Sequence, residues 1–298
     1  MAFDLKAYLE NKRVEIEKAM DAFLPEPEGL SAPLFEAMRY SVMAGGKRLR
    51  PILLLAATDT VGGDASISIS AACALEFIHT YSLIHDDLPA MDDDDLRRGK
   101  PTCHKVFGEA LAILAGDGLL TFAFEVLGRQ AVQDGVDPET VSKVIFVLAR
   151  AAGVKGMVVG QAVDVLMENS EIDGSQLAFI HRHKTGALIK ASVEIGGLLG
   201  GADQYQLDAL SSYGEALGLA FQIVDDLLDI EGDQEIIGKP VGSDLAKNKA
   251  TYPALFGIGE SKTKAREYID SAIASLSIFD EKAEPLRAIA NYVIKRNR

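Results

Sequence analysis

The chain has 298 residues, of which 48% are hydrophobic, and it carries a formal net charge of −14. A chain of this length can bury a large core, and its excess of carboxylates disfavours nucleic acids and anionic membrane surfaces as partners. Its two cysteines lack zinc-ligand spacing, so we expect reduced thiols and a cytoplasmic protein. Its uninterrupted apolar runs are short and its first twenty residues resemble no leader peptide, so we expect no stable membrane association.

Helical periodicity dominates the chain from its N-terminus onward. The stretch "DLKAYLENKRVEIEKAMDAFL" spaces its apolar residues mostly three or four apart between charges, as an amphipathic helix does. Glycine and proline punctuate the later helical segments, and strand signals are weak. We expect further helices over residues 31–43, 67–86, 110–131, 138–152, 175–199, 204–230 and 263 to the C-terminus. The sequence therefore predicts an all-α fold and, without a linker or a shift in composition, a single domain over residues 1–298.

Two of these helices are predicted to run into similar acidic sequences, "YSLIHDDLPAMD" and "FQIVDDLLD". In the second sequence, Asp225 and Asp229 lie one turn apart on the same helix face. In the first, Pro89 is expected to end the helix, and a short loop then returns Asp92 toward Asp86. If the two clusters face each other, they define one site.

The acidic clusters predict a cation. Crowded carboxylates repel one another unless a cation is bound or one of them takes up a proton. Mg²⁺ fits best, because one or two carboxylates hold it while waters and substrate phosphates complete its octahedron. Calcium fits less well, since the first cluster lacks the mid-loop glycine and the terminal glutamate of an EF-hand. The alternative is a solvated acidic loop, and the second cluster at helical spacing favours metal over that alternative.

Basic residues accompany the acidic clusters at three places. Arg97 and Arg98 directly follow the first cluster, and "GGKRLRP" places Lys47, Arg48 and Arg50 after two glycines. A Gly-rich stretch further along the chain contributes Lys239, Lys247 and Lys249. Guanidinium groups beside metal-loaded carboxylates suit phosphate oxygens. Because neither a Walker loop nor a dinucleotide motif is present, the expected ligands are diphosphates without a nucleoside.

A family resemblance follows from four stretches taken together. "GGKRLRP", "HDDLPAMDDDDLRRGKPTCH", "HRHKTGALI" and "AFQIVDDLLD" resemble the trans-type polyprenyl diphosphate synthases, most closely the bacterial farnesyl diphosphate synthases (geranyltranstransferases), over nearly the whole chain. The resemblance implies an isoprenoid synthase-type bundle of about ten core helices around a deep central cavity, usually as a homodimer. It also implies a prenyltransferase that joins isopentenyl diphosphate head to tail to an allylic diphosphate with about three Mg²⁺ ions.

The resemblance also implies roles for individual residues. The metal-binding positions are Asp86, Asp87, Asp92, Asp225, Asp226 and Asp229. The positions that would hold the allylic diphosphate are Arg97, Lys184, Lys239 and Lys249. Those for isopentenyl diphosphate are Lys47, Arg50, His79 and Arg98. Oxygens of Thr185 and Gln222, with Lys184 nearby, would stabilise an allylic cation, so the implied catalytic set is Lys184, Thr185, Gln222 and Arg97. No role is implied for Asp93, Asp94 and Asp95, which we expect to be solvated.

The resemblance implies a reaction that separates charge, and it also allows a prediction of product length. Breaking the allylic C–O bond leaves negative charge on the diphosphate, which metal and basic groups stabilise; the alkene then attacks the cation, and diphosphate takes the released proton. Ser82 lies one helical turn before Asp86, and Tyr81 lies about 7.5 Å before it along a helix. In the family, an aromatic residue at the Tyr81 position and two extra residues in the first acidic motif accompany a C15 product. We therefore expect (2E,6E)-farnesyl diphosphate, made from dimethylallyl and geranyl diphosphate.

Three alternatives stay open at this point. A geranylgeranyl diphosphate synthase of the same family would differ only in pocket depth. A class I terpene cyclase would share the fold, but "DDLLDIEGD" lacks the Asn/Ser/Glu metal pattern of cyclases. A non-catalytic regulatory subunit would be expected to have lost aspartates or lysines that this chain retains.

Overall fold

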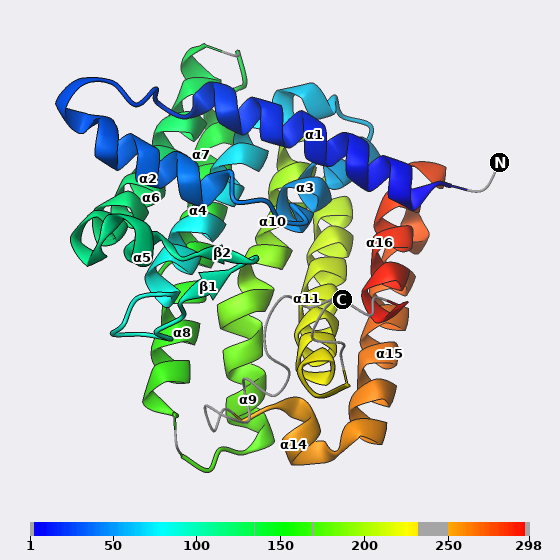
Figure 1. The fold of residues 1–298 in the computed structure, drawn as a ribbon. Coiled ribbons are helices and arrows are strands. Elements are labelled where there is room, and N and C mark those ends of the chain that lie inside the picture. The colour runs from blue at the N-terminus through cyan, green and yellow to red at the C-terminus, as the bar shows by residue number, and fades with distance from the viewer. Residues whose placement is uncertain (1–2, 134, 169, 232–249, 296–298) are drawn as a thin grey trace. The chain divides into compact units, whose positions relative to one another are not determined.

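The structure is a computed structural model that describes residues 3–133, 135–168, 170–231 and 250–295. Nearly all of its regular elements are helices (Figure 1). Within those ranges the strands are β1 (Leu96–Arg97) and β2 (Lys100–Pro101), which form one antiparallel ribbon. The predicted all-α fold class is therefore confirmed.

The chain divides into two compact units that interleave along the sequence. The first, here called the α4 unit, comprises Lys6–Ile52 and Ser66–Ile145. The second, here called the α11 unit, comprises Met1–Leu5, Leu53–Ala65 and Phe146–Arg298. The acidic sequence "IHDDLPAMD" belongs to the α4 unit and "DDLLD" belongs to the α11 unit. A single domain over the whole chain stays a prediction.

The α4 unit is built around a helix that is buried on every side. Residues 70–78 of α4 are all buried, as expected for a core helix. Helix α4 packs against α6, and the rings of Phe77 and Phe122 meet there at 5.5 Å (Figure 1). The helices and 3-10 turns of this unit are α1 (Leu5–Phe23), η1 (Gly29–Ser31), α2 (Ala32–Val42), η2 (Ala65–Ser68), α4 (Ile69–Asp86), α5 (Cys103–Phe107) and α6 (Glu109–Val132). Helices α3 (Leu49–Thr60) and α7 (Pro138–Ala152) have residues in both units.

The α11 unit surrounds its longest helix in the same way. Helix α11 packs against α10 and α15 (Figure 1), and the fully buried Tyr213 donates its hydroxyl hydrogen bond to the Leu286 carbonyl at 2.8 Å. The elements of this unit are α8 (Met157–Leu166), α9 (Gly174–Ile180), the π-helix η3 (His181–Gly186), α10 (Ala187–Leu199), α11 (Gln204–Glu231), α14 (Tyr252–Phe256), α15 (Ile258–Ser275), η4 (Leu276–Ile278), η5 (Glu281–Ala283) and α16 (Glu284–Lys295).

The expected helices are largely present, with several differences. Helix α3 was missed because Pro51 lies inside it, but in the first turn a proline costs no helical hydrogen bond. Helix α8 was missed because its glycine and β-branched residues have weak helix propensity. The helix expected from residue 263 onward is two helices, since the chain turns through η4 and η5 before α16 begins. In addition, the helix expected over 175–199 contains the π-helix η3.

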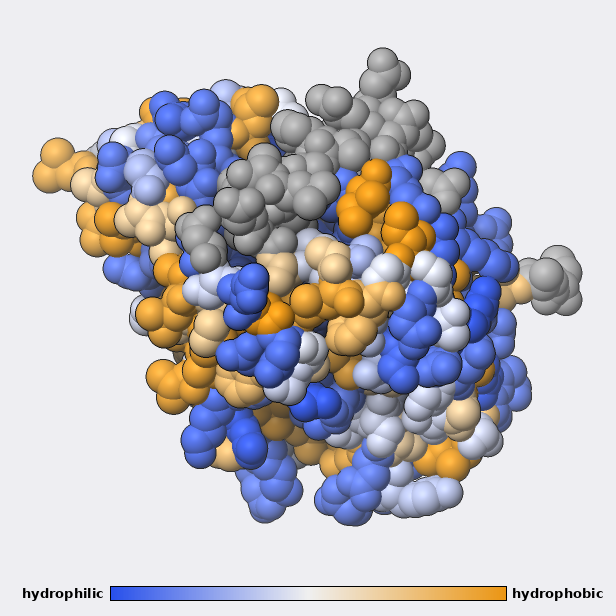
Figure 2. Space-filling model, turned by 90° about the horizontal axis from the view of Figure 1, so that it is seen from below, coloured by the Kyte–Doolittle hydropathy of each residue, from blue (hydrophilic) through white to orange (hydrophobic). Residues whose placement is uncertain are grey.

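Three helical segments are long and apolar enough to cross a membrane, by length and composition alone: Ala65–Asp86, Glu109–Gln130 and Pro138–Leu166. The length of uninterrupted apolar runs did not identify these segments. Isolated polar residues interrupt such a run, although the mean hydropathy of the whole helix stays high. In the first segment, 72% of the apolar window is buried inside the protein. The face shown in Figure 2 mixes hydrophilic and hydrophobic side chains.

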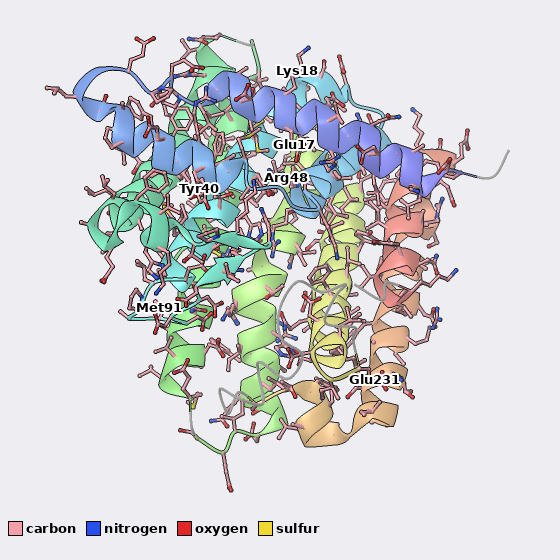
Figure 3. All side chains as sticks on the ribbon, viewed as in Figure 1. Glu17, Lys18, Tyr40, Arg48, Met91 and Glu231 are labelled. Atoms are coloured by element: carbon pink, nitrogen blue, oxygen red, sulfur yellow. The ribbon has the colours of Figure 1, made fainter. Side chains whose placement is uncertain are left out.

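A buried ion pair connects three helices of the α4 unit. The Arg48 side chain lies fully buried below α1, with Nη1 2.9 Å from Glu76 Oε1 and Nε 3.3 Å from Glu17 Oε1 (Figure 3). Its Nη2 also donates to the Val42 carbonyl at 2.6 Å. The expectation that Arg48 belongs to a phosphate-binding patch is therefore wrong, because these contacts hold its guanidinium inside the protein.

Replacing Arg48 with methionine is expected to lower the free energy of unfolding by about 3–5 kcal/mol, because the Glu76 carboxylate would stay buried without its partner. Urea unfolding followed by circular dichroism measures this change. The double variant Arg48→Met with Glu76→Leu should recover most of the loss. Arg13→Met removes only partly exposed pairs on α1 and should change little; an equal loss in both single variants would contradict the expectation.

Candidate active site

The first acidic cluster forms a turn that closes back onto the end of α4. Helix α4 ends at Asp86, and the backbone N–H of Asp92 donates to the Asp86 carbonyl at 2.8 Å. The Leu88 N–H donates to the His85 carbonyl at 3.2 Å, which tightens the exit of the helix. The loop expected from Pro89 is therefore present, and it brings the half-buried residues Asp86 and Asp92 together.

Asp87, the second aspartate of this motif, is already engaged by an arginine. Its side chain is only 4% exposed, and both of its oxygens accept from Arg97 Nε, at 2.7 and 2.9 Å. Arg97 Nη2 lies 2.5 Å from Asp87 Oδ1 and 3.6 Å from Asp94 Oδ2. A charge-assisted pair of this kind is strong and directional. It holds the Arg97 side chain on the cluster that follows α4.

Arg98 is turned away from Arg97 by a tight hairpin. Arg98 and Gly99 connect β1 to β2 with φ angles of 54° and 75°, the left-handed values that a type I′ turn needs. The Arg98 guanidinium donates to the Gly45 carbonyl and lies against Gly46, where a Cβ atom would come within 2.7 Å of it. Gly46 therefore makes room for the Arg98 side chain, and Gly46 directly precedes Lys47 in the sequence.

Two further residues predicted to bind isopentenyl diphosphate contact each other. Arg50 Nη1 lies 3.3 Å from His79 Nε2. Burial, followed by the charges of Arg50 and Arg98, holds the pKa of His79 well below its ordinary value. A neutral His79 accepts the Arg50 N–H through Nε2. The structure thus brings Arg50 together with His79 and Arg98 next to Lys47, all within the α4 unit.

The predicted catalytic residues of the α11 unit line one cavity of about 110 Å³. Lys184 Nζ lies 2.6 Å from Asp164 Oδ2, and Thr185 Oγ1 donates to Gln222 Oε1 at 2.8 Å. The walls of the cavity include Asp164, His181, Lys184, Thr185, Gln222, Asp226 and Thr251. The pairing of Asp164 with Lys184 was not predicted, because no sequence pattern links residues twenty positions apart.

The π-helix η3 presents Lys184 and Thr185 to this cavity. A π-turn adds one residue to a helical turn, and such turns are frequent at functional sites. Helix α8 approaches this turn closely at Gly160, where a Cβ atom would lie 2.2 Å from the Lys184 backbone nitrogen. His181 also lines the cavity, whereas His183 stacks on Phe179 with ring centroids 3.9 Å apart. Burial lowers the pKa of His181 to about 4, so this imidazole is neutral at pH 7.

The second acidic cluster divides its carboxylates between two environments. Asp226 is buried, accepting from Gln222 Nε2 at 2.9 Å and from the Tyr252 backbone N–H at 2.8 Å. Asp225 and Asp229 are half-buried, one turn apart on α11. The first cluster repeats this division, since its second aspartate is also the buried one.

Metal binding fits the half-buried carboxylates. No three His, Cys, Asp or Glu side chains in the described part of the chain are grouped to hold a metal ion. Mg²⁺ needs no such group, because one or two carboxylates suffice when waters and phosphates supply the other oxygens. Lys239, Lys247 and Lys249 lie outside the described residues.

The two residues predicted to set product length lie on α4 before the first cluster. Tyr81 is 6% exposed, its ring meets the His85 ring edge-on at 5.7 Å, and burial raises its pKa to about 12. Ser82 is half-buried and donates to the His79 carbonyl at 2.9 Å. A neutral phenol packed on α4 is a rigid steric element.

Fold and sequence define a protein of the all-α class, with an Asp-Asp-Leu sequence at or near the C-terminal end of one long helix in each unit. Residues 31–291 match the polyprenyl synthetase family. The chain therefore belongs to the polyprenyl synthetase family, and it is an enzyme of the prenyltransferase class.

Individual relatives agree with that assignment. The chain is 49% identical over 293 residues to a farnesyl diphosphate synthase of Geobacillus stearothermophilus, covering 98% of each chain. It is 47% identical to a chloroplastic geranylgeranyl pyrophosphate synthase of Catharanthus roseus, covering 99% of this chain and 82% of the relative. A crystal structure of an FPP/GFPP synthase from Zymomonas mobilis matches with a TM-score of 0.87 at 40% identity, covering 99% of this chain and 100% of that one. The recognition of the family from its motifs is confirmed.

Proposed function

We propose that the protein is a Mg²⁺-dependent farnesyl diphosphate synthase that joins isopentenyl diphosphate to dimethylallyl and then geranyl diphosphate. The observation that carries this proposal is the single cavity in which Lys184 meets the Thr185–Gln222 oxygen pair, on the helix that also bears Asp225 and Asp229. A cation next to paired oxygens suits a reaction that separates an anionic leaving group from a carbocation.

The half-buried aspartates are the proposed metal ligands. These are Asp86, Asp92, Asp225 and Asp229, whereas Asp87 and Asp226 are buried. When bound, Mg²⁺ would neutralise charge that develops on the leaving diphosphate. Arg97 and Lys184 would hold the oxygens of that diphosphate, and Lys239 and Lys249 are proposed to do the same.

Isopentenyl diphosphate is assigned to the basic group of the α4 unit. Lys47, Arg50 and Arg98 would bind its phosphate oxygens as charged donors. His79, kept neutral by burial and by Arg50, would orient Arg50 and add no charge. The departing diphosphate is proposed to accept the proton released after the alkene attacks. We further propose a cytoplasmic homodimer with one synthase domain over residues 1–298.

Tyr81 carries the proposed C15 product length. We expect Tyr81→Ala to shift the main product from farnesyl to geranylgeranyl diphosphate or longer. The substitution removes the rigid, buried phenol (6% exposed) that is proposed to block further growth of the prenyl chain. Reversed-phase separation of the prenols after phosphatase treatment measures the shift. The control is Tyr40→Ala on α2, an aromatic of the same unit that is engaged with Phe107 and Pro101.

Two outcomes would count against the steric role of Tyr81. Unchanged product length in Tyr81→Ala would reject it, as would equal lengthening in Tyr40→Ala. A wild-type enzyme that already makes geranylgeranyl diphosphate would favour the C20 alternative, which the likeness to geranylgeranyl pyrophosphate synthases keeps in view.

A further inference from the structure

Asp226 is surrounded by hydrogen-bond donors that come from three elements of the α11 unit. Its Oδ1 accepts from Gln222 Nε2 at 2.9 Å, and its Oδ2 accepts from the backbone N–H of Tyr252, the first residue of α14, at 2.8 Å. His181 Nε2 of the π-helix lies 3.5 Å from Oδ2. With 3% exposure, this carboxylate is part of the protein interior.

The carboxylate decides which way the Gln222 amide points. An ionised carboxylate only accepts hydrogen bonds, so the amide group that faces Asp226 must be the NH₂. The amide oxygen is then at the opposite end, where it accepts from the Thr185 hydroxyl at 2.8 Å. Hydrogen bonds therefore run in one direction, from Thr185 to Gln222 to Asp226. With its proton directed at Gln222, the Thr185 oxygen keeps its lone pairs for the cavity.

The direction of this relay matters for the chemistry of the cavity. Reversing the amide would place the Gln222 NH₂, a partial positive charge, where a carbocation is proposed to form. In its observed direction, the relay ends on a buried negative charge, and chains of hydrogen bonds polarise one another, which raises the negative charge on both oxygens. Both effects stabilise a cation without contact between Asp226 and the substrate.

We infer that Asp226 is a positioning residue, which orients and polarises the Thr185–Gln222 oxygen pair toward the allylic cation. This inference rests on the proposed function of the same cavity. It gives the second aspartate of "DDLLD" a task different from that of Asp225, although the two residues are adjacent and chemically identical.

The first test compares matched substitutions at neighbouring positions. Asp226→Asn presents an NH₂ group to Gln222 and permits the reversed amide, so kcat should fall by about 10²-fold while KM for geranyl diphosphate stays within about twofold. The Mg²⁺ concentration for half-maximal rate should not change. Asp225→Asn removes a proposed ligand and should raise that concentration by about tenfold or more.

A readout that does not depend on turnover separates the two residues again. Thermal unfolding is followed with inorganic diphosphate during a Mg²⁺ titration that starts in EDTA. Asp226→Asn should keep the wild-type Mg²⁺ midpoint, because Asp226 is buried and its amide replacement can still accept from the Tyr252 N–H. Asp225→Asn should shift the Mg²⁺ midpoint upward.

An exchange of charge tests the direction of the relay itself. In the double variant Gln222→Glu with Asp226→Asn, the new amide can donate to residue 222 and still accept from the Tyr252 N–H, while the new carboxylate accepts from Thr185. This arrangement restores the original direction, so the double variant should recover at least about tenfold of the lost kcat. A role in packing alone predicts no such recovery.

The outcomes are distinguishable. A wild-type chain that forms no prenyl product rejects the proposed function. If the wild type is active, two results overturn the inference about Asp226 alone: a Mg²⁺ midpoint in Asp226→Asn that shifts as in Asp225→Asn, or a folded double variant with no recovery. Circular dichroism establishes whether the variants fold. If the double variant does not fold, the Mg²⁺ midpoint of Asp226→Asn alone tests the inference.

Discussion

Asp86→Asn is expected to lower kcat by about 10²- to 10³-fold and to raise the Mg²⁺ requirement, because it replaces a proposed metal ligand with a neutral amide of the same size. Asp86 ends α4, and its backbone carbonyl already holds the returning loop through the Asp92 N–H. The substitution leaves that backbone contact in place. Steady-state rates across a Mg²⁺ titration measure both effects.

The same loop offers a matched control. Asp93 is exposed and has a φ of 51°, a conformation that asparagine also tolerates. Asp93→Asn makes the identical chemical change a few residues away and should leave kcat and the Mg²⁺ requirement within about twofold. Equal losses in Asp86→Asn and Asp93→Asn would show that the rate depends on the charge of the loop in general, with no particular ligand.

Lys184→Met is expected to lower kcat/KM for the allylic diphosphate by about 10²-fold, since the cavity would lose the cation proposed to hold the leaving group. Steady-state rates at varied geranyl diphosphate measure the loss. The substitution also leaves Asp164, now 2.6 Å from Lys184 Nζ, without its partner. The double variant with Asp164→Asn removes that unpaired charge and should remain inactive to the same degree.

Lys190→Met is the control on the following helix. Lys190 lies 3.6 Å from Glu215 and 3.9 Å from Glu194, and it lies outside the cavity that Lys184 lines. Its replacement should change kcat/KM by less than about twofold. Recovery of activity in the Lys184→Met, Asp164→Asn double variant would indicate that the charge of Lys184 serves only to neutralise Asp164.

The fold was predictable because its long helices carry strong periodicity and clear ends. The expected helices over 138–152 and 204–230 agree with α7 and α11 to within one residue. The break between α15 and α16 and the π-turn were not predictable, since each depends on tertiary packing more than on local propensity. Gly160 illustrates this dependence, because it matters only once α8 lies against η3.

The sequence identified the residues of the site, but it did not show which role each of them has. Sequence motifs group Asp86 with Asp87 and Asp225 with Asp226, and nothing in either pair distinguishes its members. The structure separates them by burial, because the second member of each pair faces protein donors. The partnership of Asp164 with Lys184 was equally unpredictable, since it joins residues twenty positions apart.

The most direct test of the central claim is a product assay on the wild-type protein. Labelled isopentenyl diphosphate is incubated with dimethylallyl or geranyl diphosphate in Mg²⁺, in EDTA, and in EDTA followed by excess Mg²⁺, and the extracted prenols are separated by chain length. We predict farnesol as the main product from both allylic substrates, absent in EDTA and restored by Mg²⁺. Failure to form any condensation product from either allylic substrate with Mg²⁺ present would contradict the account.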